Sequence, residues 1–471
     1  MTLEDVGPDN ATPDWTALQA SIAGNVVRPG STAYDELPHT FNARFHDVVP
    51  LAVVRCATPE DVRETLTFVH RHGLASATRA GGHCFAGRSS TRGMVIDISP
   101  MRSVSVSGDV VTVGAGATSG EVYEALQEHG LAIPAGTCPT VGVAGVTLGG
   151  GLGILGRTHG VTSDHLLAAQ IVVADGRVLD VDDDHHEDLF WALRGAGAGN
   201  FGVVTSLVLG TVPAPDVTNV HLSWPFSHAA EVIEAWQVWA PDAPDELAAS
   251  LKLTEPGGDD PAPVVDVYAA FQGTESEAAN LLDQLVVRAG SDPTSSSSRA
   301  MSFAETRAFW ADLGAEEGGG GPEASLEHPY LVAKSEFFRR HLPSEVIAAL
   351  LATFSESWTP GQFRELDFMP WGGAYNRVRP DATAFVHRSE RVLLKHAAVV
   401  DPAANADQKE AAMAWATRSW AGIHPWGSGL AFPNFADPDV EDWTAAAYGT
   451  NADRLSRVKA TYDPAGLFRF S

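Results

Sequence analysis

The chain of 471 residues is poor in cysteine and in long apolar runs. Its three cysteines, Cys56, Cys84 and Cys138, are too few and odd in number for a disulfide framework, so a functional cysteine is expected to act through its reactivity. No apolar run reaches the roughly 18 residues of a membrane span, so no membrane association is expected. The acidic N-terminus, MTLEDVGPDN, lacks the apolar core of a secretory signal, and the expected location is the cytoplasm.

Basic residues are also scarce, with 31 lysines and arginines against 59 acidic residues and a formal net charge of −28. Binding to a phosphate backbone requires a basic surface, so the charge excludes a nucleic-acid partner. The acidity is interpreted as a solvated surface. At roughly 150 residues for each domain, the length predicts about three units. We expect a monomer or a homodimer.

A glycine-rich stretch over residues 79–90, RAGGHCFAGRSS, follows a short strand expected at 73–78. Its glycines leave the backbone free to adopt positive φ and to approach a ligand closely. Successive backbone N–H groups in such a turn form a nest that binds anions. His83 stands inside this nest. The combination predicts a phosphate-bearing cofactor that is held by its ring as well as by its phosphates.

A second glycine-rich stretch covers residues 135–160 and holds nine glycines, which disfavours both a stable helix and an ordinary strand. Interleaved valine, leucine and isoleucine argue against a flexible linker, so a surface shaped to a flat ligand is favoured. Two other motifs resemble a dinucleotide fingerprint. The motif at 114–119 lacks its third glycine, and the one at 197–202 has a helix before it and a strand after it. Neither is a Rossmann site, although 197–202 is a candidate for close backbone approach.

Hydrophobic periodicity, caps and turn residues predict the remaining elements. A change of composition after Pro213 suggests a substrate domain inserted between two parts of a cofactor domain. Residues 291–298 and 316–321 are interpreted as surface loops, with an active-site lid as the alternative. The expected helices are 14–23, 58–71, 121–128, 189–194, 229–239, 275–287, 344–354 and 452–461, and the expected strands are 48–55, 94–98, two within 104–113, a 165–181 hairpin with a type I′ turn, 203–209, 251–253, 264–271 and a short aromatic strand after Pro464.

Three motifs together resemble the berberine-bridge-enzyme-like oxidoreductases, within the wider vanillyl-alcohol-oxidase class of FAD-linked oxidases. They are RAGGH at 79–83, AGTCPTVG at 135–142 and, in the tail from Tyr448, YGTN…RL..VK..YDP…LF. The resemblance is strong over 48–209 and after Trp443, and weak over 369–388. It implies an α+β fold with a two-subdomain PCMH-type FAD-binding domain (1–212), a substrate domain whose antiparallel sheet covers the flavin (213–424), and a C-terminal segment returning to the FAD domain (425–471).

The same resemblance implies bicovalent FAD, joined as 8α-histidyl through His83 and as 6-S-cysteinyl through Cys138. Both side chains are good nucleophiles towards an electron-poor ring. Val141 matches the position that controls access of O2 to the flavin, and Cys84 is expected only to pack. No metal site is expected. The further cofactor-binding residues implied are Arg79, Ala80, Gly81, Gly82, Gly87, Arg88, Ser89, Thr140, Val141, Gly142, Gly145, Thr147, Gly149, Gly150, Gly153, Gly202, Val203, Val204 and Asn451. Family members often have Gly-Gly-His where this chain has Ala144-Gly145-Val146.

Oxidation of an alcohol requires a base for its O–H group, and a tyrosine with a lowered pKa suits this role. The resemblance points to Tyr448 and Tyr375, with packing against the flavin and an ordinary strand aromatic as the respective alternatives. Asn376 is a candidate for hydrogen bonding to substrate. Glu365 and Asp367 alternate along the preceding strand, where a solvated edge is favoured over a catalytic carboxylate.

The function expected from these residues is that of an FAD-dependent oxidase. It would take hydride from an alcohol or activated C–H bond of a bulky secondary metabolite or sugar and reduce O2 to H2O2. The alternatives are a flavin-dependent oxygenase or oxidative cyclase acting on a polyketide-like substrate, and a weakly active flavin-binding module.

Overall fold

The computed structural model describes residues 13–255, 263–316, 328–356 and 358–468. Its first sheet has the strand order β1 (Asn25–Val27), β2 (Ala52–Arg55), β4 (Met94–Asp97) and β3 (Ser76–Arg79). β2 and β3 both run parallel to β4. Parallel strands of one sheet require a crossover connection, and α3 (Pro59–Arg71) provides it between β2 and β3, which lie on either side of β4. Its Thr58 cap accepts a hydrogen bond from Asp61 N, as the sequence predicts.

The strand expected over 48–55 begins only at Ala52. Val49 and Leu51 are exposed, at 47% and 48%, and do not belong to the buried strand. Pro50 has no N–H group to donate to a sheet ladder, which explains the late start.

A second sheet is antiparallel and has the order β5 (Val104–Ser107), β6 (Val110–Gly114), β10 (Gly202–Gly210), β8 (Leu166–Val173) and β9 (Val178–Val181). It shares one apolar core with the first sheet, α3, α4 (Ser119–Gln127) and α7 (Glu187–Ala196). The hairpin between β8 and β9 is confirmed, but its type I′ turn is wrong. Gly176 has a φ of 82° and Asp175 keeps a negative φ, so the connection is a three-residue loop that ends in a left-handed glycine.

The segment 135–160 forms two short helices, α5 (Val143–Leu148) and α6 (Gly156–His159), within otherwise irregular backbone. The expectation of no helix is therefore wrong for these residues. The helices have six and four residues, because glycines end both of them: Gly149 follows α5, and Gly160, with a φ of 97°, follows α6.

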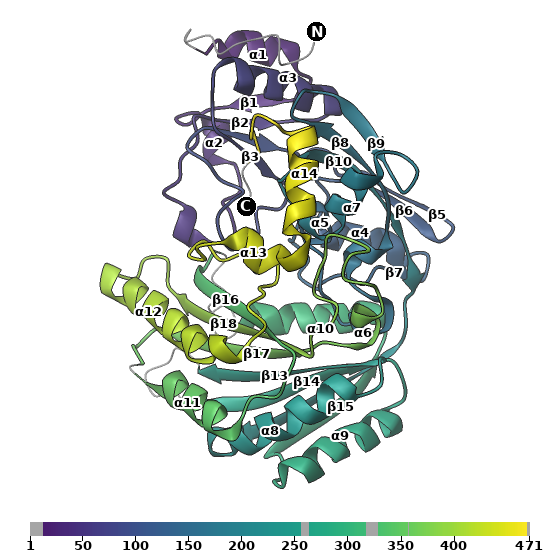
Figure 1. The fold of residues 1–471 in the computed structure, drawn as a ribbon, viewed down its shortest axis with the longest axis vertical. Helices are drawn as coiled ribbons and strands as arrows, with labels where there is room; N and C mark the ends of the chain where they lie inside the picture. Colours follow the sequence, from purple (N-terminus) through teal and green to yellow (C-terminus); the bar gives the residue numbers. More distant parts are fainter. Residues whose placement is uncertain (1–12, 256–262, 317–327, 357, 469–471) are drawn as a thin grey trace.

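The middle of the chain builds a seven-stranded antiparallel sheet, which crosses the lower half of Figure 1. The helices α8 (Ala229–Trp239), α9 (Glu275–Ala289), α11 (Ser344–Ser355) and α12 (Ala406–Ile423) share a core with one face of this sheet. The opposite face is turned towards the first two sheets. The strand order is β15 (Ser295–Met301), β12 (Val217–Pro225), β14 (Val264–Phe271), β13 (Leu247–Glu255), β17 (Phe363–Pro370), β18 (Val392–Val400) and β16 (Tyr330–Phe338).

Two expectations for this region are corrected. Ser295–Ser298 were expected in a loop but belong to the exposed edge strand β15, because β12 offers them a complete partner ladder. Tyr375 was expected on a strand but lies in a 3-10 turn, η6 (Gly373–Asn376), after Gly372 and Gly373 at φ values of 128° and 57°. Of the loop expected at 316–321, Glu316 ends the helix α10 (Phe303–Glu316) and 317–321 lie outside the described residues.

The tail crosses back to the first two sheets, where α13 (Trp443–Tyr448) and α14 (Ala452–Tyr462) lie against them in Figure 1. Lys459 Nζ donates to the carbonyl oxygens of Asn200 and Phe468, each at 2.5 Å. The aromatic strand expected after Pro464 does not form in the described residues. The Asp463 carboxylate instead accepts hydrogen bonds from the N–H groups of Leu467 and Phe468, so the tail ends in a side-chain-stabilised turn.

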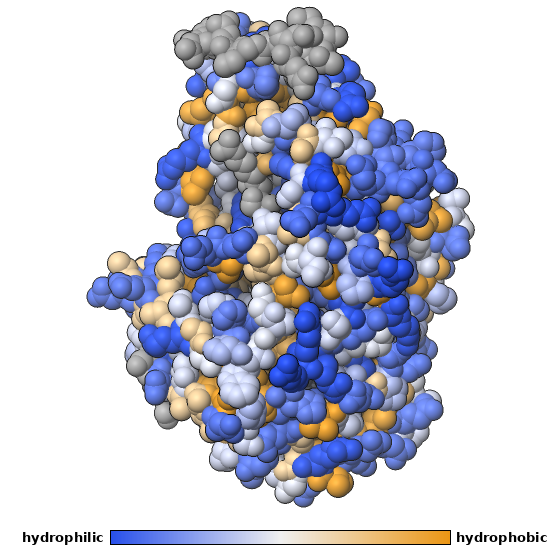
Figure 2. Space-filling model, viewed as in Figure 1, coloured by the Kyte–Doolittle hydropathy of each residue, from blue (hydrophilic) through white to orange (hydrophobic). Residues whose placement is uncertain are grey.

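The face shown in Figure 2 is largely hydrophilic, with apolar residues scattered over it. None of the described helices is both long and apolar enough to cross a lipid bilayer.

A buried ion pair joins the turn that follows the second glycine-rich segment to the segment between β17 and β18. Arg388 donates two hydrogen bonds to Asp164, with Nη1 to Oδ2 at 2.9 Å and Nη2 to Oδ1 at 2.6 Å. The Arg388 side chain is completely buried, and it also donates to the carbonyl oxygen of Tyr375. The cation therefore depends on Asp164 for charge compensation.

We predict that Asp164→Asn lowers the free energy of unfolding by about 3 kcal/mol, because it leaves the Arg388 guanidinium buried without its carboxylate. The measurement is urea unfolding followed by tryptophan fluorescence. Asp381→Asn is the matched control, since its partner Arg379 is 80% exposed, and its unfolding midpoint should not change. Equal midpoints for the two variants would contradict the prediction.

Candidate active site

A cavity of about 510 Å³ lies between the two glycine-rich segments and the opposite face of the seven-stranded sheet. This volume is in the range of small-molecule sites. One wall comes from residues 76–89 and 136–157, and the other from β13, β17 and β18. A ligand in this cavity would touch both halves of the molecule.

His83 lies on the first wall, in the loop after β3. Gly82 and Gly87 have φ values of 72° and 67°, as the nest requires. The imidazole stacks on the Phe41 ring at 4.7 Å, and its Nε2 is 3.0 Å from Thr140 Oγ1. Burial, with a smaller contribution from His328, lowers the pKa of His83 to about 4. The imidazole is therefore neutral at neutral pH, which is the nucleophilic form.

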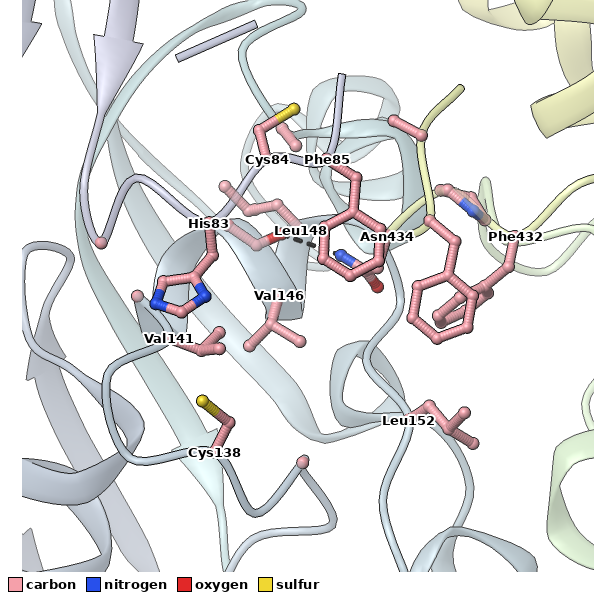
Figure 3. A pocket seen from close by; sticks show the side chains of 18 of the residues that line it. His83, Cys84, Phe85, Cys138, Val141, Val146, Leu148, Leu152, Phe432 and Asn434 are labelled. Carbon is pink, nitrogen blue, oxygen red and sulfur yellow. Dashed lines mark hydrogen bonds between the residues drawn. The ribbon is translucent and has the colours of Figure 1, made fainter. Parts of the chain in front are cut away.

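Cys138 lies on the same wall and is exposed. Its Sγ is 3.5 Å from Thr140 Oγ1, so this hydroxyl group touches both His83 and Cys138. Figure 3 shows the sulfur pointing towards the side of the cavity that holds His83, with Val141 beside them. The structure thus brings together the two side chains that the sequence predicts for covalent attachment.

The glycines of the two segments serve two different purposes: some allow close backbone contact, and one leaves space in the cavity. A Cβ atom at Gly81 would collide with the backbone nitrogen of Gly142, and one at Gly142 with the backbone nitrogen of Gly81. The segments therefore touch backbone to backbone at this point. A Cβ atom at Gly145 would meet no protein atom within 4 Å, so this glycine leaves space in the cavity.

The polar lining fits a ligand rich in phosphate and hydroxyl oxygens. The hydroxyl groups of Ser76, Thr78 and Ser89 are buried at the cavity, and none has a hydrogen-bond partner among the described residues. Buried hydroxyl groups are nearly always satisfied in a folded protein. Together with the backbone nest around His83, they suit the pyrophosphate and ribityl groups of FAD.

The predicted cofactor residues divide into two groups. Besides His83 and Cys138, the cavity is lined by Ala80, Gly81, Gly82, Arg88, Ser89, Val141, Gly142, Gly145, Gly153, Gly202 and Val204. Backbone of the 197–202 motif also lines it, at Gly197, Ala198 and Gly199. Not among the lining residues are Arg79, Gly87, Thr140, Thr147, Gly149, Gly150, Val203 and Asn451.

Several of this second group support the loops instead. Arg79 Nε donates to the Ser89 carbonyl oxygen at 3.1 Å. Asn451 Nδ2 donates to the carbonyl oxygen of Pro380 at 2.8 Å and so ties the tail to the segment between η6 and β18. These residues shape the cavity without facing it.

The second wall carries a row of charged side chains. Lys252 on β13, Asp367 on β17 and Lys395 on β18 lie directly opposite one another in the sheet register. Lys395 Nζ is 2.7 Å from Glu365 Oε1 and 3.8 Å from Asp367 Oδ2. All three residues of the row line the cavity.

The solvated edge expected for Glu365 and Asp367 is wrong, since the two residues are only 2% and 7% exposed. Burial raises the pKa of Asp367 above its ordinary value, although Lys252 and Lys395 act against this shift. Asp367 Oδ1 is buried and has no hydrogen-bond partner among the described residues. Neither lysine was predicted from the sequence; their signal is a single cation within an apolar strand, KLTE at 252–255 and LLKH at 393–396.

The three catalytic candidates lie in different places. Tyr375 lines the cavity, stacks on the Trp371 ring at 4.3 Å and donates from its hydroxyl to the Gly153 carbonyl oxygen at 3.2 Å. Burial raises the pKa of Tyr375. Tyr448 is buried away from the cavity, where its hydroxyl accepts from Asn200 Nδ2. Asn376 does not line the cavity and donates to the Glu390 carbonyl oxygen.

Aromatic side chains and one amide complete the site. Asn434 Oδ1 accepts from Gly151 N at 3.0 Å, and its Nδ2 donates to the Gly145 carbonyl oxygen, so the tail side holds the glycine-rich segment in place. Five cavity-lining residues were not predicted from the sequence: Phe85, Trp310, Phe432, Asn434 and Phe435.

Comparisons with known proteins agree with this architecture. Residues 50–182 match the FAD binding domain family, and residues 431–471 match the family described as berberine and berberine like. An FAD-linked oxidoreductase of Bacillus subtilis, YgaK, is 31% identical over 96% of this chain and 97% of its own. Berberine bridge enzyme-like 7 of Arabidopsis thaliana is 31% identical over 89% of this chain and 83% of its own.

A solved structure shares the fold over nearly the whole chain. It is Phl p 4, a grass pollen allergen with glucose dehydrogenase activity, with a TM-score of 0.84 and 26% identity over 97% of this chain and 98% of that one. The α+β expectation, with PCMH-type sheets and a covering antiparallel sheet, is confirmed. The chain therefore belongs to the berberine bridge enzyme-like family of FAD-linked oxidoreductases.

Proposed function

We propose that the chain is an oxidase whose FAD is attached to both His83 and Cys138. It takes hydride from an alcohol carbon of a small polyhydroxylated substrate and passes the electrons to O2, which becomes H2O2. The observation that carries the proposal is the pair of nucleophiles on one cavity wall, joined through Thr140, opposite the buried Asp367 on the other wall.

The residues of the first wall would hold the cofactor. The nest of residues 80–83 and the hydroxyl groups of Ser76, Thr78 and Ser89 suit its phosphate and ribityl oxygens. Gly145 leaves room for a flat ring. When bound, the flavin supplies a two-electron acceptor for hydride.

The chain must then take the proton of the substrate hydroxyl, and we assign this role to Asp367. A general base must lie in the cavity with a free acceptor atom, and Asp367 Oδ1 meets both conditions. The hydroxyl proton of Tyr375 is already donated to Gly153, so Tyr375 is better suited to orienting the substrate. Tyr448 and Asn376 do not face the cavity, and their role is structural in this proposal.

Two observations support the choice of acceptor and of substrate class. The side chain at position 141 is a small valine on the wall that carries both nucleophiles, which leaves room for O2. The charged row of Lys252, Asp367 and Lys395 offers hydrogen-bonding groups for a polyhydroxylated molecule such as a sugar. The glucose dehydrogenase activity of Phl p 4 agrees with this class.

We predict that acid precipitation of the protein gives a yellow pellet. His83→Ala and Cys138→Ala should each keep the flavin in the pellet through the remaining bond, and the double variant should release it. The measurement is flavin absorbance of the pellet and the supernatant, with the intact mass of the chain as confirmation. A colourless wild-type pellet with bound flavin in the supernatant would show non-covalent FAD and contradict the proposal.

We predict that Asp367→Asn lowers kcat by about 100-fold with unchanged flavin content, because general base catalysis contributes at least this factor. In the wild type, kcat should fall as the pH drops through the pKa of Asp367, which burial places above the ordinary aspartic acid value of about 3.9. The measurement is steady-state kinetics with the best substrate of a sugar and alcohol panel. Tyr375→Phe is the control, and a larger loss in that variant than in Asp367→Asn would make the tyrosine the base.

We predict that Val141→Leu slows reoxidation of the reduced flavin by O2 by about tenfold, which corresponds to roughly 1.4 kcal/mol in the barrier. The larger side chain fills space on the wall beside both attachment residues. Reduction of the flavin by substrate should stay the same, so a dye acceptor should restore turnover. Stopped-flow absorbance measures both half-reactions, with Val141→Ala as the control that keeps the fast reaction. Equal reoxidation rates in Val141→Leu and the wild type would remove Val141 from this role.

A further inference from the structure

Thr140 has an unusual position for a residue that does not line the cavity. Its Oγ1 lies 3.0 Å from Nε2 of His83 and 3.5 Å from Sγ of Cys138. The two side chains proposed to bond the flavin come from segments 55 residues apart, and one hydroxyl group links them.

The backbone around Thr140 is fixed from both sides. Gly120 N donates to the Pro139 carbonyl oxygen at 3.0 Å, and Ser119 N donates to the Val141 carbonyl oxygen at 2.8 Å. Both donors belong to the first turn of α4, whose Thr118 and Glu121 form a capping box. The backbone on both sides of Thr140 is therefore held by the N-terminal turn of a helix.

The imidazole of His83 is fixed as well. Its ring lies against Phe41 with an angle of 17° between the ring planes, so it cannot rotate freely. The ring is neutral, since burial lowers its pKa to about 4, and therefore one nitrogen carries a hydrogen and the other a lone pair. Among the described residues, only Thr140 is hydrogen-bonded to this ring, through Nε2.

Two arrangements in which the hydroxyl donates to one group and accepts from the other differ in what they leave reactive. In the first, Cys138 donates its S–H to Oγ1 and the hydroxyl donates to Nε2, which leaves a neutral thiol and a hydrogen on Nδ1. In the second, Nε2–H donates to Oγ1, the hydroxyl donates to the Cys138 sulfur, and the thiol proton has passed to solvent, to which Cys138 is exposed; the sulfur is then a thiolate and the lone pair of Nδ1 is free. Thiolates and unprotonated nitrogens are the nucleophilic forms, so only the second arrangement activates both side chains.

We propose that the Thr140 hydroxyl is the positioning residue for flavin attachment. It accepts the Nε2 hydrogen of His83 and donates to the sulfur of Cys138, so that the bond from His83 forms at Nδ1 and the bond from Cys138 forms from the thiolate. This inference rests on the proposed bicovalent attachment and assigns a role to a residue that neither forms a bond to the ring nor faces it.

The chemistry balances with O2 as oxidant. Each attachment forms one carbon–nitrogen or carbon–sulfur bond, at the 8α carbon or at C6. It breaks one C–H bond of the cofactor and one N–H or S–H bond of the chain. The two electrons and two protons released at each attachment reduce one O2 to H2O2.

The test compares Thr140→Val with Thr140→Ser in the full-length protein. Valine keeps the shape and removes the hydroxyl, whereas serine keeps the hydroxyl. Cells are sampled at intervals after induction, and flavin fluorescence of the denatured chain is measured on a gel and divided by the amount of chain. We expect covalent attachment in Thr140→Val to be slowed by about tenfold, the effect of losing one hydrogen bond worth roughly 1.4 kcal/mol, and Thr140→Ser to match the wild type.

The single variants separate the two bonds. In a Cys138→Ala background the Thr140→Val change reports on His83 alone, and in a His83→Ala background on Cys138 alone, so slowing is expected in both. Total flavin in the native protein, bound covalently or not, should be equal in Thr140→Val and Thr140→Ser, which distinguishes an attachment role from a folding defect. Attachment in Thr140→Val at the wild-type rate, or an equal loss in Thr140→Ser, would overturn the inference, whereas a wild type without covalent flavin would overturn the proposed function itself.

Discussion

The backbone contact between Gly81 and Gly142 is the constraint on which the site depends. Because neither position has room for a side chain, the loop after β3 and the segment before α5 meet at the distance of bare peptide groups. This contact also brings His83 and Cys138 close together, since His83 lies two residues after Gly81 and Cys138 lies four residues before Gly142. A larger residue at either glycine would separate the loops and the two nucleophiles with them.

The opposite wall depends on a different kind of order, the register of an antiparallel sheet. A shift of one residue in the strand register would turn Lys252, Asp367 and Lys395 towards the core that the sheet shares with its helices. It would place leucine and phenylalanine side chains at the cavity instead. The buried pair of Asp164 and Arg388 then ties this half of the molecule to the glycine-rich half. The site is thus assembled from two rigid surfaces, each defined within its own half, and a few specific links between them.

The sequence predicted what local patterns determine. The Thr58 cap with Pro59 predicted the start of α3. The pattern and length of the apolar runs predicted β14, α8 and α11 close to their observed bounds. Glu365 and Asp367 show where local reasoning fails. Their exposure depends on lysines more than 100 residues before and about 30 residues after them, so an acidic alternation on one strand cannot distinguish an open edge from a compensated interior. The prediction that Tyr375 lies on a strand is wrong for another reason: Gly372 and Gly373 turn the chain out of the strand.

The C-terminal segment has a consequence for biosynthesis. Phe432, Asn434 and Phe468 line the cavity, and Asn434 anchors the glycine-rich segment at Gly145 and Gly151, nearly 290 residues earlier in the chain. The walls of the cavity can therefore close only after the segment from Phe432 to Phe468 has left the ribosome. A chain truncated before Phe432 lacks part of the enclosure however well its first half folds.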